Sequence, residues 1–193
     1  MPEPRIVVLT RWPEPGRAKT RLIPAIGAER AAALHRRLTE RTLTAVQASG
    51  LPFELRVTGA PIAAFRDWLG PLPIVDQGEG DLGERLAHAG PPYPTLLIGS
   101  DAPDLSAELL RRAADALATS AAVIGPAEDG GYWLLGLARP VEGVFDGIEW
   151  STERVFAQTR DHLRQAGIEP AVLPKLADCD GPEDLARWPD LAA

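Results

Sequence analysis

The sequence predicts an α/β domain in which a mostly parallel sheet carries helices on both faces and contains one antiparallel insertion. Short apolar runs alternate with stretches of helical periodicity from end to end. The run at residues 95–99 is almost wholly apolar, which is typical of a strand buried on both faces. Gly130 and Gly131 precede another apolar run, and a turn at these glycines would reverse the direction of the chain.

Apolar runs and alternating patterns define the strands. Residues 5–10 and 121–125 are apolar runs, and residues 53–58 alternate apolar and polar side chains. The full set of predicted strands comprises residues 5–10, 53–58, 73–76, 95–99, 121–125, 132–137 and 169–173. Residues 11–24 are rich in Pro, Gly and basic residues and are therefore expected to form a loop.

Helical spacing defines the connections. Apolar residues recur at near-helical spacing over residues 28–48, and Gly50 ends this segment. The predicted helices comprise residues 28–48, 63–69, 82–89, 106–119, 152–166 and 182–188. Asp104 or Ser106 is the expected N-cap of helix 106–119, and Ser151 that of helix 152–166. Strands alternating with helices favour parallel pairing through crossover connections.

Composition limits the classes of function. The chain has 193 residues, 45% of them hydrophobic, which suits a single domain over residues 1–193. Its net charge of −7 argues against nucleic acid or an anionic membrane surface as a partner. No apolar run approaches the roughly 20 residues that span a bilayer. Cys179 is the only cysteine, so an intrachain disulfide is excluded, in keeping with a cytoplasmic protein.

A basic loop follows the first strand. Arg11, Arg17, Lys19 and Arg21 lie close together in an otherwise acidic chain. Open α/β sheets bind ligands at the carboxyl ends of their strands, so these side chains could pair with phosphate oxygens there. Gly16 would let the backbone approach such a ligand. The loop is not a P-loop, because Ala, not Gly, precedes the lysine. A solvated basic loop is the alternative.

Asp101 stands at the carboxyl end of the strand at residues 95–99. It has no basic neighbour in sequence, and a carboxylate in that place suits a divalent cation that carries a substrate phosphate. A helix cap is the alternative role. Ser100 lacks the flanking glycines of a nucleophile elbow and is not expected to attack a substrate. Asp180 precedes the last helix, where it could cap the helix or supply a second metal carboxylate.

Two further segments carry polar groups. Glu128 and Asp129 follow a buried strand without a basic residue nearby in sequence, and one of them could act as a general base or bind a hydroxyl. A plain hairpin turn is the alternative. Trp150 and Ser151 precede the helix predicted from Thr152. The tryptophan is expected in the core and the two hydroxyls at the helix cap, with anion binding as the other role.

The histidines carry no recognisable metal spacing. His35 and His162 fall within predicted helices and are expected at the surface.

Five segments together resemble a known family. In chain order they are RWPEPGRAKTRL, LLIGSDAPDL, GPAEDGGYWLLGL, GIEWST and DCDGPEDL. They are similar to those of the small bacterial GT-A-like nucleotide-diphospho-sugar transferases of the arsenosugar-biosynthesis type. The resemblance runs from about the first strand to the last helix. The segment Pro-Gly-x-x-Lys-Thr-Arg-Leu is also similar to that of 2-phospholactate guanylyltransferases.

The resemblance implies a Rossmann-like GT-A fold, a nucleotide-activated sugar donor and Mg²⁺ or Mn²⁺. It places Asp101 where related enzymes carry a metal-binding aspartate. Pro103 replaces the second carboxylate of an Asp-x-Asp motif, which gives Asp180 more weight as the other metal ligand. The residues expected to bind the nucleotide or its phosphates are Thr10, Arg11, Gly16, Arg17, Lys19, Arg21 and Ser100.

The leading hypothesis is a metal-dependent transfer of a sugar from a nucleotide-diphospho-sugar to a hydroxyl of a small acceptor. Asp129 or Glu128 would orient or deprotonate that hydroxyl. The residues expected to contact the acceptor are Gly130, Gly131, Trp150, Ser151 and Thr152. Two alternatives stay open: nucleotidyl transfer from an NTP to a phosphorylated small molecule, and a non-catalytic nucleotide-binding protein. The expected partners are therefore small molecules, and the sequence leaves a homodimer open.

Overall fold

The computed structural model describes residues 2–192 and contains a seven-stranded sheet in the order β3-β2-β1-β4-β6-β5-β7. The strands are β1 (Arg5–Arg11), β2 (Phe53–Thr58), β3 (Ile74–Asp76), β4 (Thr95–Ile98), β5 (Ala122–Pro126), β6 (Tyr132–Leu137) and β7 (Ala171–Val172). β6 runs antiparallel to β4 and β5, whereas the other neighbouring pairs are parallel. The predicted fold class and the antiparallel insertion are both confirmed.

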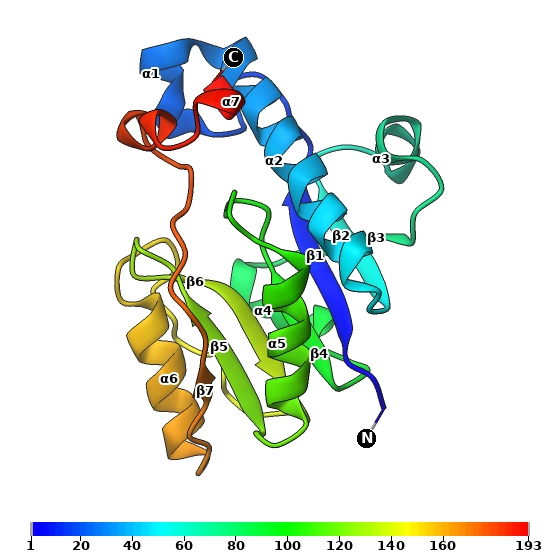
Figure 1. Cartoon of the computed structure of the whole chain (residues 1–193), viewed down its shortest axis with the longest axis vertical. Helices are drawn as coiled ribbons and strands as arrows, with labels where there is room; N and C mark the ends of the chain where they lie inside the picture. The colour runs from blue at the N-terminus through cyan, green and yellow to red at the C-terminus, as the bar shows by residue number, and fades with distance from the viewer. Residues whose placement is uncertain (1, 193) are drawn as a thin grey trace.

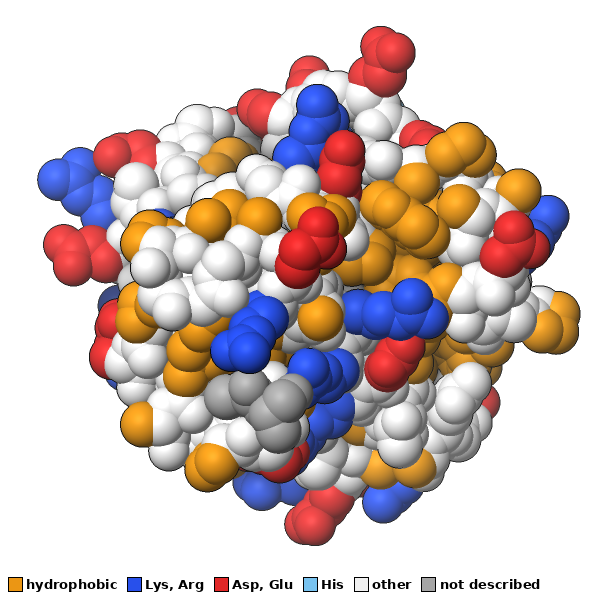
Figure 2. Space-filling view, turned by 90° about the horizontal axis from the view of Figure 1, so that it is seen from above, with side chains coloured by type: hydrophobic (Ala, Val, Ile, Leu, Met, Phe, Trp, Pro, Cys, Tyr) orange, Lys and Arg blue, Asp and Glu red, His pale blue; other side chains and the backbone are white. Residues whose placement is uncertain are grey.

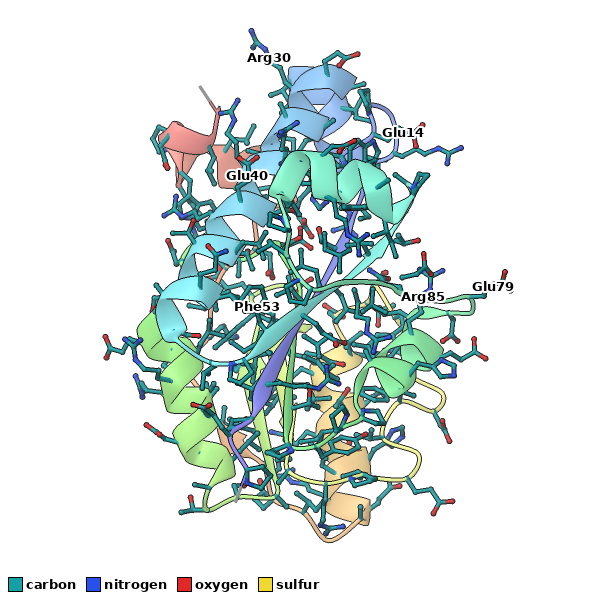
Figure 3. The ribbon with its side chains drawn as sticks, turned by 90° about the vertical axis from the view of Figure 1, so that its right-hand side faces the viewer. Glu14, Arg30, Glu40, Phe53, Glu79 and Arg85 are labelled. Atoms are coloured by element: carbon teal, nitrogen blue, oxygen red, sulfur yellow. The ribbon has the colours of Figure 1, made fainter. Side chains whose placement is uncertain are left out.

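Helices cover both faces of this sheet. They are α1 (Ile23–Ile26), α2 (Ala28–Ser49), α3 (Ile62–Leu69), α4 (Leu82–Ala89), α5 (Ala107–Leu117), α6 (Val155–Gln165) and α7 (Pro189–Ala192). Figure 3 shows α2 and α5 on one side of the sheet and α4 and α6 on the other. Across residues 2–192, no helix combines the length and the apolar character needed to cross a membrane.

The core has one layer on each face, and β4 contributes to both. Leu96 and Ile98 pack into the cluster under α2 and α5, whereas Leu97 packs into the cluster under α4 and α6. Successive side chains of a strand point to opposite faces, so an unbroken apolar run is what a strand covered on both sides requires. β4 therefore ends in the middle of the molecule, and the residues after it emerge at the edge of the sheet.

The chain departs from the sequence-based expectations at three places. Residues 11–24 are not wholly a loop, because a 3₁₀ turn (Thr20–Leu22) lies within them and α1 begins at Ile23. The helix expected over residues 182–188 is a shorter 3₁₀ helix (Pro182–Ala186), and α7, which follows it, was not expected. α6 begins at Val155, so Ser151 does not cap it; a φ of 65° places Ser151 in the left-handed region. By contrast, Ser106 caps α5 as predicted, accepting a hydrogen bond from the Leu109 amide.

The C-terminal segment crosses the edge of the sheet. After β7 it runs up one side of the molecule to α1 and α2 (Figure 1). There Trp188, Leu191 and Cys179 join a third buried cluster with Leu22 and Leu34. This packing carries residues 178–180 over the carboxyl ends of the strands, next to the segment that follows β4.

Candidate active site

Three distant segments meet at the upper edge of the sheet in Figure 1, where β1 and β4 end. The Nζ atom of Lys19 lies 2.5 Å from Oδ1 of Asp101 and 2.6 Å from Oδ1 of Asp180. The Lys19 side chain is 5% exposed, whereas the two carboxylates are 45% and 35% exposed. The ammonium group is thus buried beneath two carboxylates that still face solvent.

Backbone geometry holds this cluster together. Lys19 has a φ of 48°, a left-handed conformation that non-glycine residues seldom adopt and that often marks a functional position. The backbone amide of Cys179 donates a hydrogen bond of 2.9 Å to the carbonyl oxygen of Asp101. This bond ties the C-terminal segment to the end of β4. The separation of the two carboxylates is therefore set by the main chain.

The charges of the cluster shift its pKa values strongly. Burial alone would lower the pKa of Lys19, but the carboxylates of Asp101 and Asp180 raise it above its usual value. Burial alone would raise the pKa of Asp101, but the ammonium of Lys19 holds it below its usual value. Burial and then the neighbouring carboxylates, Asp129 first, raise the pKa of Asp178 to about 7. The three side chains of the ion-paired cluster, one ammonium group and two carboxylates, together carry a net negative charge.

A chain of buried hydroxyls supports the site from behind. Thr10 Oγ1 lies 3.1 Å from Thr39 Oγ1 and 3.2 Å from Ser100 Oγ, and all three side chains are buried. Thr10 and Ser100, both expected to bind the nucleotide, thus link β1, α2 and the segment after β4. Such a network fixes the positions of elements whose other residues face the ligand.

His35 is a site residue that the sequence analysis missed. It is 5% exposed rather than at the surface, and Nε2 lies 3.1 Å from the carbonyl oxygen of Arg11. Burial lowers its pKa, so the ring is neutral near pH 7. Its position in a long helix next to apolar residues gave no signal, because buried and exposed histidines look alike in a sequence.

The basic side chains of the loop after β1 line a cavity of about 330 Å³, here called the basic pocket. Its basic lining residues are Arg11, Arg17, Lys19, Arg21 and His35. Asp101 and Asp180 lie at the same cavity. The structure thus brings together the four basic residues that the sequence analysis had grouped. Gly16 has a φ of 86° in the same loop, which permits the turn before Lys19.

A second cavity of about 290 Å³ adjoins the first and is called here the acidic pocket. Asp101, Asp180 and Ser151 line both cavities. Asp129 and Asp178 also line the acidic pocket, and much of the rest of its lining is apolar. Its apolar lining side chains include Leu82, Leu86, Trp150 and Val155. Figure 2 shows this edge of the molecule from above, with Lys and Arg side chains near the middle and hydrophobic side chains gathered to the right.

Of the five residues expected to bind the acceptor, four line the acidic pocket and one supports the turn beside it. Gly131, Trp150, Ser151 and Thr152 line the acidic pocket. The hydroxyl of Thr152 donates a hydrogen bond to the carbonyl oxygen of Glu149. Neither Ser151 nor Thr152 caps α6, which begins at Val155 without a side-chain cap. The tryptophan is only partly buried and packs against the ring of Phe145.

Asp129 and Glu128 have different surroundings. Asp129 faces the acidic pocket, where its Oδ1 accepts a 2.8 Å hydrogen bond from the amide of Gly131. Glu128 is 51% exposed, and its carboxylate forms a 2.6 Å ion pair with Arg187. The C-terminal segment thus supplies Glu128 with a basic partner that lies 59 residues away in the sequence. The chemistry at the pocket can be assigned to Asp129 more readily than to Glu128.

Gly130 supports the site through its lack of a side chain. Its φ is 87°, and a Cβ there would lie 2.3 Å from the backbone oxygen of Glu153, in the segment that follows Ser151. Its carbonyl oxygen also accepts a hydrogen bond from the amide of Phe156. The turn that carries Asp129 and the loop that carries Ser151 are thus in direct backbone contact.

Gly130→Ala should therefore lower the free energy of unfolding more than a strained backbone alone would. Gly147→Ala is a matched control, because Gly147 has a φ of 64° and open space around its Cβ position. We expect a cost of about 1 kcal/mol for the control and about 3 kcal/mol for Gly130→Ala, measured by urea unfolding. Equal costs would show that the contact with Glu153 is not needed.

The carboxylates suit a hard divalent cation. Within residues 2–192, no three His, Cys, Asp or Glu side chains form a ready-made metal site, and Asp101 and Asp180 contact Lys19 instead. Magnesium ions commonly bind through one or two carboxylates together with substrate phosphates. The donor set here consists of oxygen atoms, and Oδ2 of Asp178 is buried without a hydrogen-bond partner. These residues therefore fit a cation that arrives with a phosphorylated ligand.

The sequence matches one protein family over residues 41–152, and that family carries the description "Uncharacterized protein conserved in bacteria (DUF2064)". The chain belongs to the DUF2064 family. The matched region of this DUF2064 chain includes Asp101, Asp129 and the loop up to Thr152. No curated protein sequence matches the chain.

Solved structures place this DUF2064 chain among GT-A-like folds. One such structure is of a Desulfovibrio desulfuricans G20 protein, whose name assigns it provisionally to the nucleotide-diphospho-sugar transferases. It is 33% identical in sequence to this chain, with a TM-score of 0.90. That match covers 98% of this chain and 88% of the other. The family resemblance and the GT-A-like fold expected from the sequence are thereby confirmed.

Two more distant structures share the fold. A manganese complex of a Mycobacterium tuberculosis H37Rv protein is 19% identical with a TM-score of 0.58, covering 96% of this chain and 97% of that one. The 2-C-methyl-D-erythritol 4-phosphate cytidylyltransferase of Thermus thermophilus is 16% identical with a TM-score of 0.58. It is matched over 100% of this chain and 99% of its own.

Proposed function

We propose that this transferase moves a sugar from a nucleotide-diphospho-sugar to a hydroxyl group of a small acceptor, with Mg²⁺ or Mn²⁺ as cofactor. The observation that carries the proposal is the convergence of Lys19, Asp101 and Asp180 between a basic and an acidic pocket. A nucleotide diphosphate needs cationic partners, and the transfer needs a second binding place directly beside it.

The basic pocket is the proposed site of the diphosphate. Arg11, Arg17 and Arg21 offer forked guanidinium groups that suit phosphate oxygens. Lys19 lies deeper, where its ammonium group could contact the phosphate nearest the sugar. These charges would stabilise the nucleoside diphosphate as it leaves.

Asp101 and Asp180 are the proposed metal ligands. When bound, a divalent cation would offset negative charge that develops on the leaving diphosphate. The hard oxygen donors and the excess of carboxylates support this assignment. The manganese complex of the M. tuberculosis structure also supports it, since that protein shares the fold.

Asp129 is the proposed general base. The acceptor hydroxyl would give its proton to Asp129 as its oxygen bonds to the sugar carbon. Trp150, Ser151 and Thr152 would form the opposite wall of the acceptor site. In this proposal Glu128 contributes through its ion pair with Arg187, which links the turn after β5 to the C-terminal segment.

Nucleotidyl transfer is the second candidate, because the T. thermophilus cytidylyltransferase shares the fold. In that reaction Lys19 and the arginines would hold a triphosphate and pyrophosphate would leave. The released product distinguishes the two reactions: a nucleoside diphosphate indicates glycosyl transfer, and pyrophosphate indicates nucleotidyl transfer.

A thermal-shift titration tests the proposal. The probes are the diphosphates of uridine, guanosine, cytidine, adenosine and thymidine, each with Mn²⁺ and with EDTA. A ligand at 100 times its Kd stabilises the folded state by about 2.7 kcal/mol, so one nucleotide should raise the melting temperature when Mn²⁺ is present.

Asp101→Asn should abolish that metal-dependent shift. Asp115→Asn is the control, because Asp115 is an exposed residue of α5. An unchanged shift in Asp101→Asn would contradict the metal assignment. If the wild-type protein responds to none of the nucleotides, the proposed donor is wrong.

A further inference from the structure

The two adjoining pockets differ sharply in charge. The basic pocket contains three arginines and Lys19. Among the described residues that line the acidic pocket there are four aspartates and no Lys, Arg or His. Lys19 contacts Asp101 and Asp180, which leaves Asp129 and Asp178 without a cationic partner from the pocket lining.

A bound donor would not reverse this difference. Its two phosphates and a divalent cation carry nearly equal and opposite charges, and the three arginines lie on the donor side. The carboxylate of Asp129 would therefore keep a negative field in the remaining part of the acidic pocket. Fields of this kind act strongly in a narrow, partly apolar cavity, where water screens charges poorly.

The shape and lining of the acidic pocket indicate the rest of its ligand. A cavity of about 290 Å³ accommodates a small molecule, since a cavity of roughly 150 Å³ already holds one benzene ring. Leu82, Leu86, Trp150 and Val155 offer apolar contacts, and Leu82 remains 41% exposed. An exposed large apolar side chain at a pocket mouth gains from contact with an apolar part of a ligand.

We infer that the second substrate is a small hydroxyl compound with an apolar body that carries no anionic group, and that a positive charge on it favours binding. This inference rests on the proposed function, because it takes the acidic pocket as the acceptor site. It excludes phosphorylated and carboxylated acceptors. It therefore also weighs against nucleotidyl transfer to a phosphorylated small molecule.

Three probes that share one ring and differ in charge test the inference. They are benzyltrimethylammonium, benzyl alcohol and phenylacetate, titrated against the full chain by ligand-observed NMR. Inorganic pyrophosphate and diamagnetic Mg²⁺ are present in these titrations so that phenylacetate cannot bind in the basic pocket. The cation should bind at least tenfold more tightly than the carboxylate, with the alcohol between them.

Asp129→Asn should reduce that preference at least threefold. An asparagine oxygen can still accept the hydrogen bond from Gly131, so the turn is kept. Asp115→Asn on α5 should leave the preference unchanged. Equal binding of the cation and the carboxylate, an unchanged preference in Asp129→Asn, or no binding of any probe at millimolar concentration would overturn the inference.

The binding of pyrophosphate with Mg²⁺ is measured first and separately. Its absence would count against the proposed donor site. The cation and the alcohol are then titrated without pyrophosphate, which measures the charge preference of the acidic pocket by itself. Tighter binding of the cation supports the inference, and tighter binding of the alcohol contradicts it. Failure of the proposed function and failure of the inference are thus told apart.

Discussion

Lys19→Met should make the folded protein depend on divalent cations for much of its stability. The ammonium group of Lys19 is buried and contacts both Asp101 and Asp180. Its removal leaves two carboxylates facing each other, and loss of one partner from a buried ion pair commonly costs about 3–5 kcal/mol. Because both carboxylates are partly exposed, we expect a smaller cost of about 2 kcal/mol in EDTA.

Mn²⁺ should restore most of that loss, since a cation can take over the charge of the ammonium group. Urea unfolding in EDTA and in Mn²⁺ measures both effects. Arg17→Met is the control, because its side chain lies in the same loop but is 74% exposed and pairs with Glu14 instead. The control keeps the ammonium group of Lys19 between the two carboxylates and should gain less from Mn²⁺. If Mn²⁺ does not stabilise Lys19→Met, Asp101 and Asp180 do not bind the ion.

Asp178→Asn should stabilise the protein at alkaline pH and leave it unchanged in acid. The pKa of Asp178 is raised from 3.8 to about 7 in the folded state by burial and by Asp129, Asp101 and Asp180. The folded state binds this proton more tightly than the unfolded state does, so protonation of Asp178 stabilises the fold. That stabilisation is fully present below pH 4 and is lost as the pH rises through about 7. Asparagine does not ionise and avoids that loss.

The expected difference between Asp178→Asn and wild type is about 2 kcal/mol at pH 8, after allowance for solvent screening. It should shrink towards zero near pH 4. Urea unfolding across this range, in EDTA, provides the measurement. Asp115→Asn should follow the wild-type curve at every pH, and a constant offset for Asp178→Asn would show that ionisation of Asp178 is not the cause.

Local patterns predicted the fold because each depends on neighbours in the sequence. The apolar run of β4 and the glycine pair before β6 are signals of this kind, and the structure has the corresponding strand and reversal. The start of α6 was misplaced because Ser151 adopts a left-handed conformation. Serine and threonine before an apolar stretch normally indicate a cap, and only the tertiary contact of Gly130 with Glu153 shows why the helix starts later.

The sequence predicted which types of residue form the candidate site, but it did not predict which of them contact one another. Basic residues after β1 and an aspartate after β4 were expected to meet, since parallel strands end at one edge. The sequence could not reveal that Lys19 would pair with Asp180, which lies 161 positions away. The ion pair of Glu128 with Arg187 is equally non-local, at a separation of 59 residues. Such contacts arise from the path of the C-terminal segment, which no local pattern encodes.

Because of this path, the site could be disrupted while the rest of the fold stays intact. β7 adds two residues to the edge of the sheet. Beyond it the segment is held by the hydrogen bond of the Cys179 amide to Asp101, by the ion pair of Asp180 with Lys19 and by the packing of its last residues against α2 and its neighbours. Proteins open in cooperative units of unequal stability, and a peripheral segment of this kind can detach at a lower free energy than the sheet itself. Detachment would withdraw Asp178 and Asp180 together while β1, β4 and Lys19 stay in place. Opening of the C-terminal segment would therefore disassemble the site without unfolding the sheet.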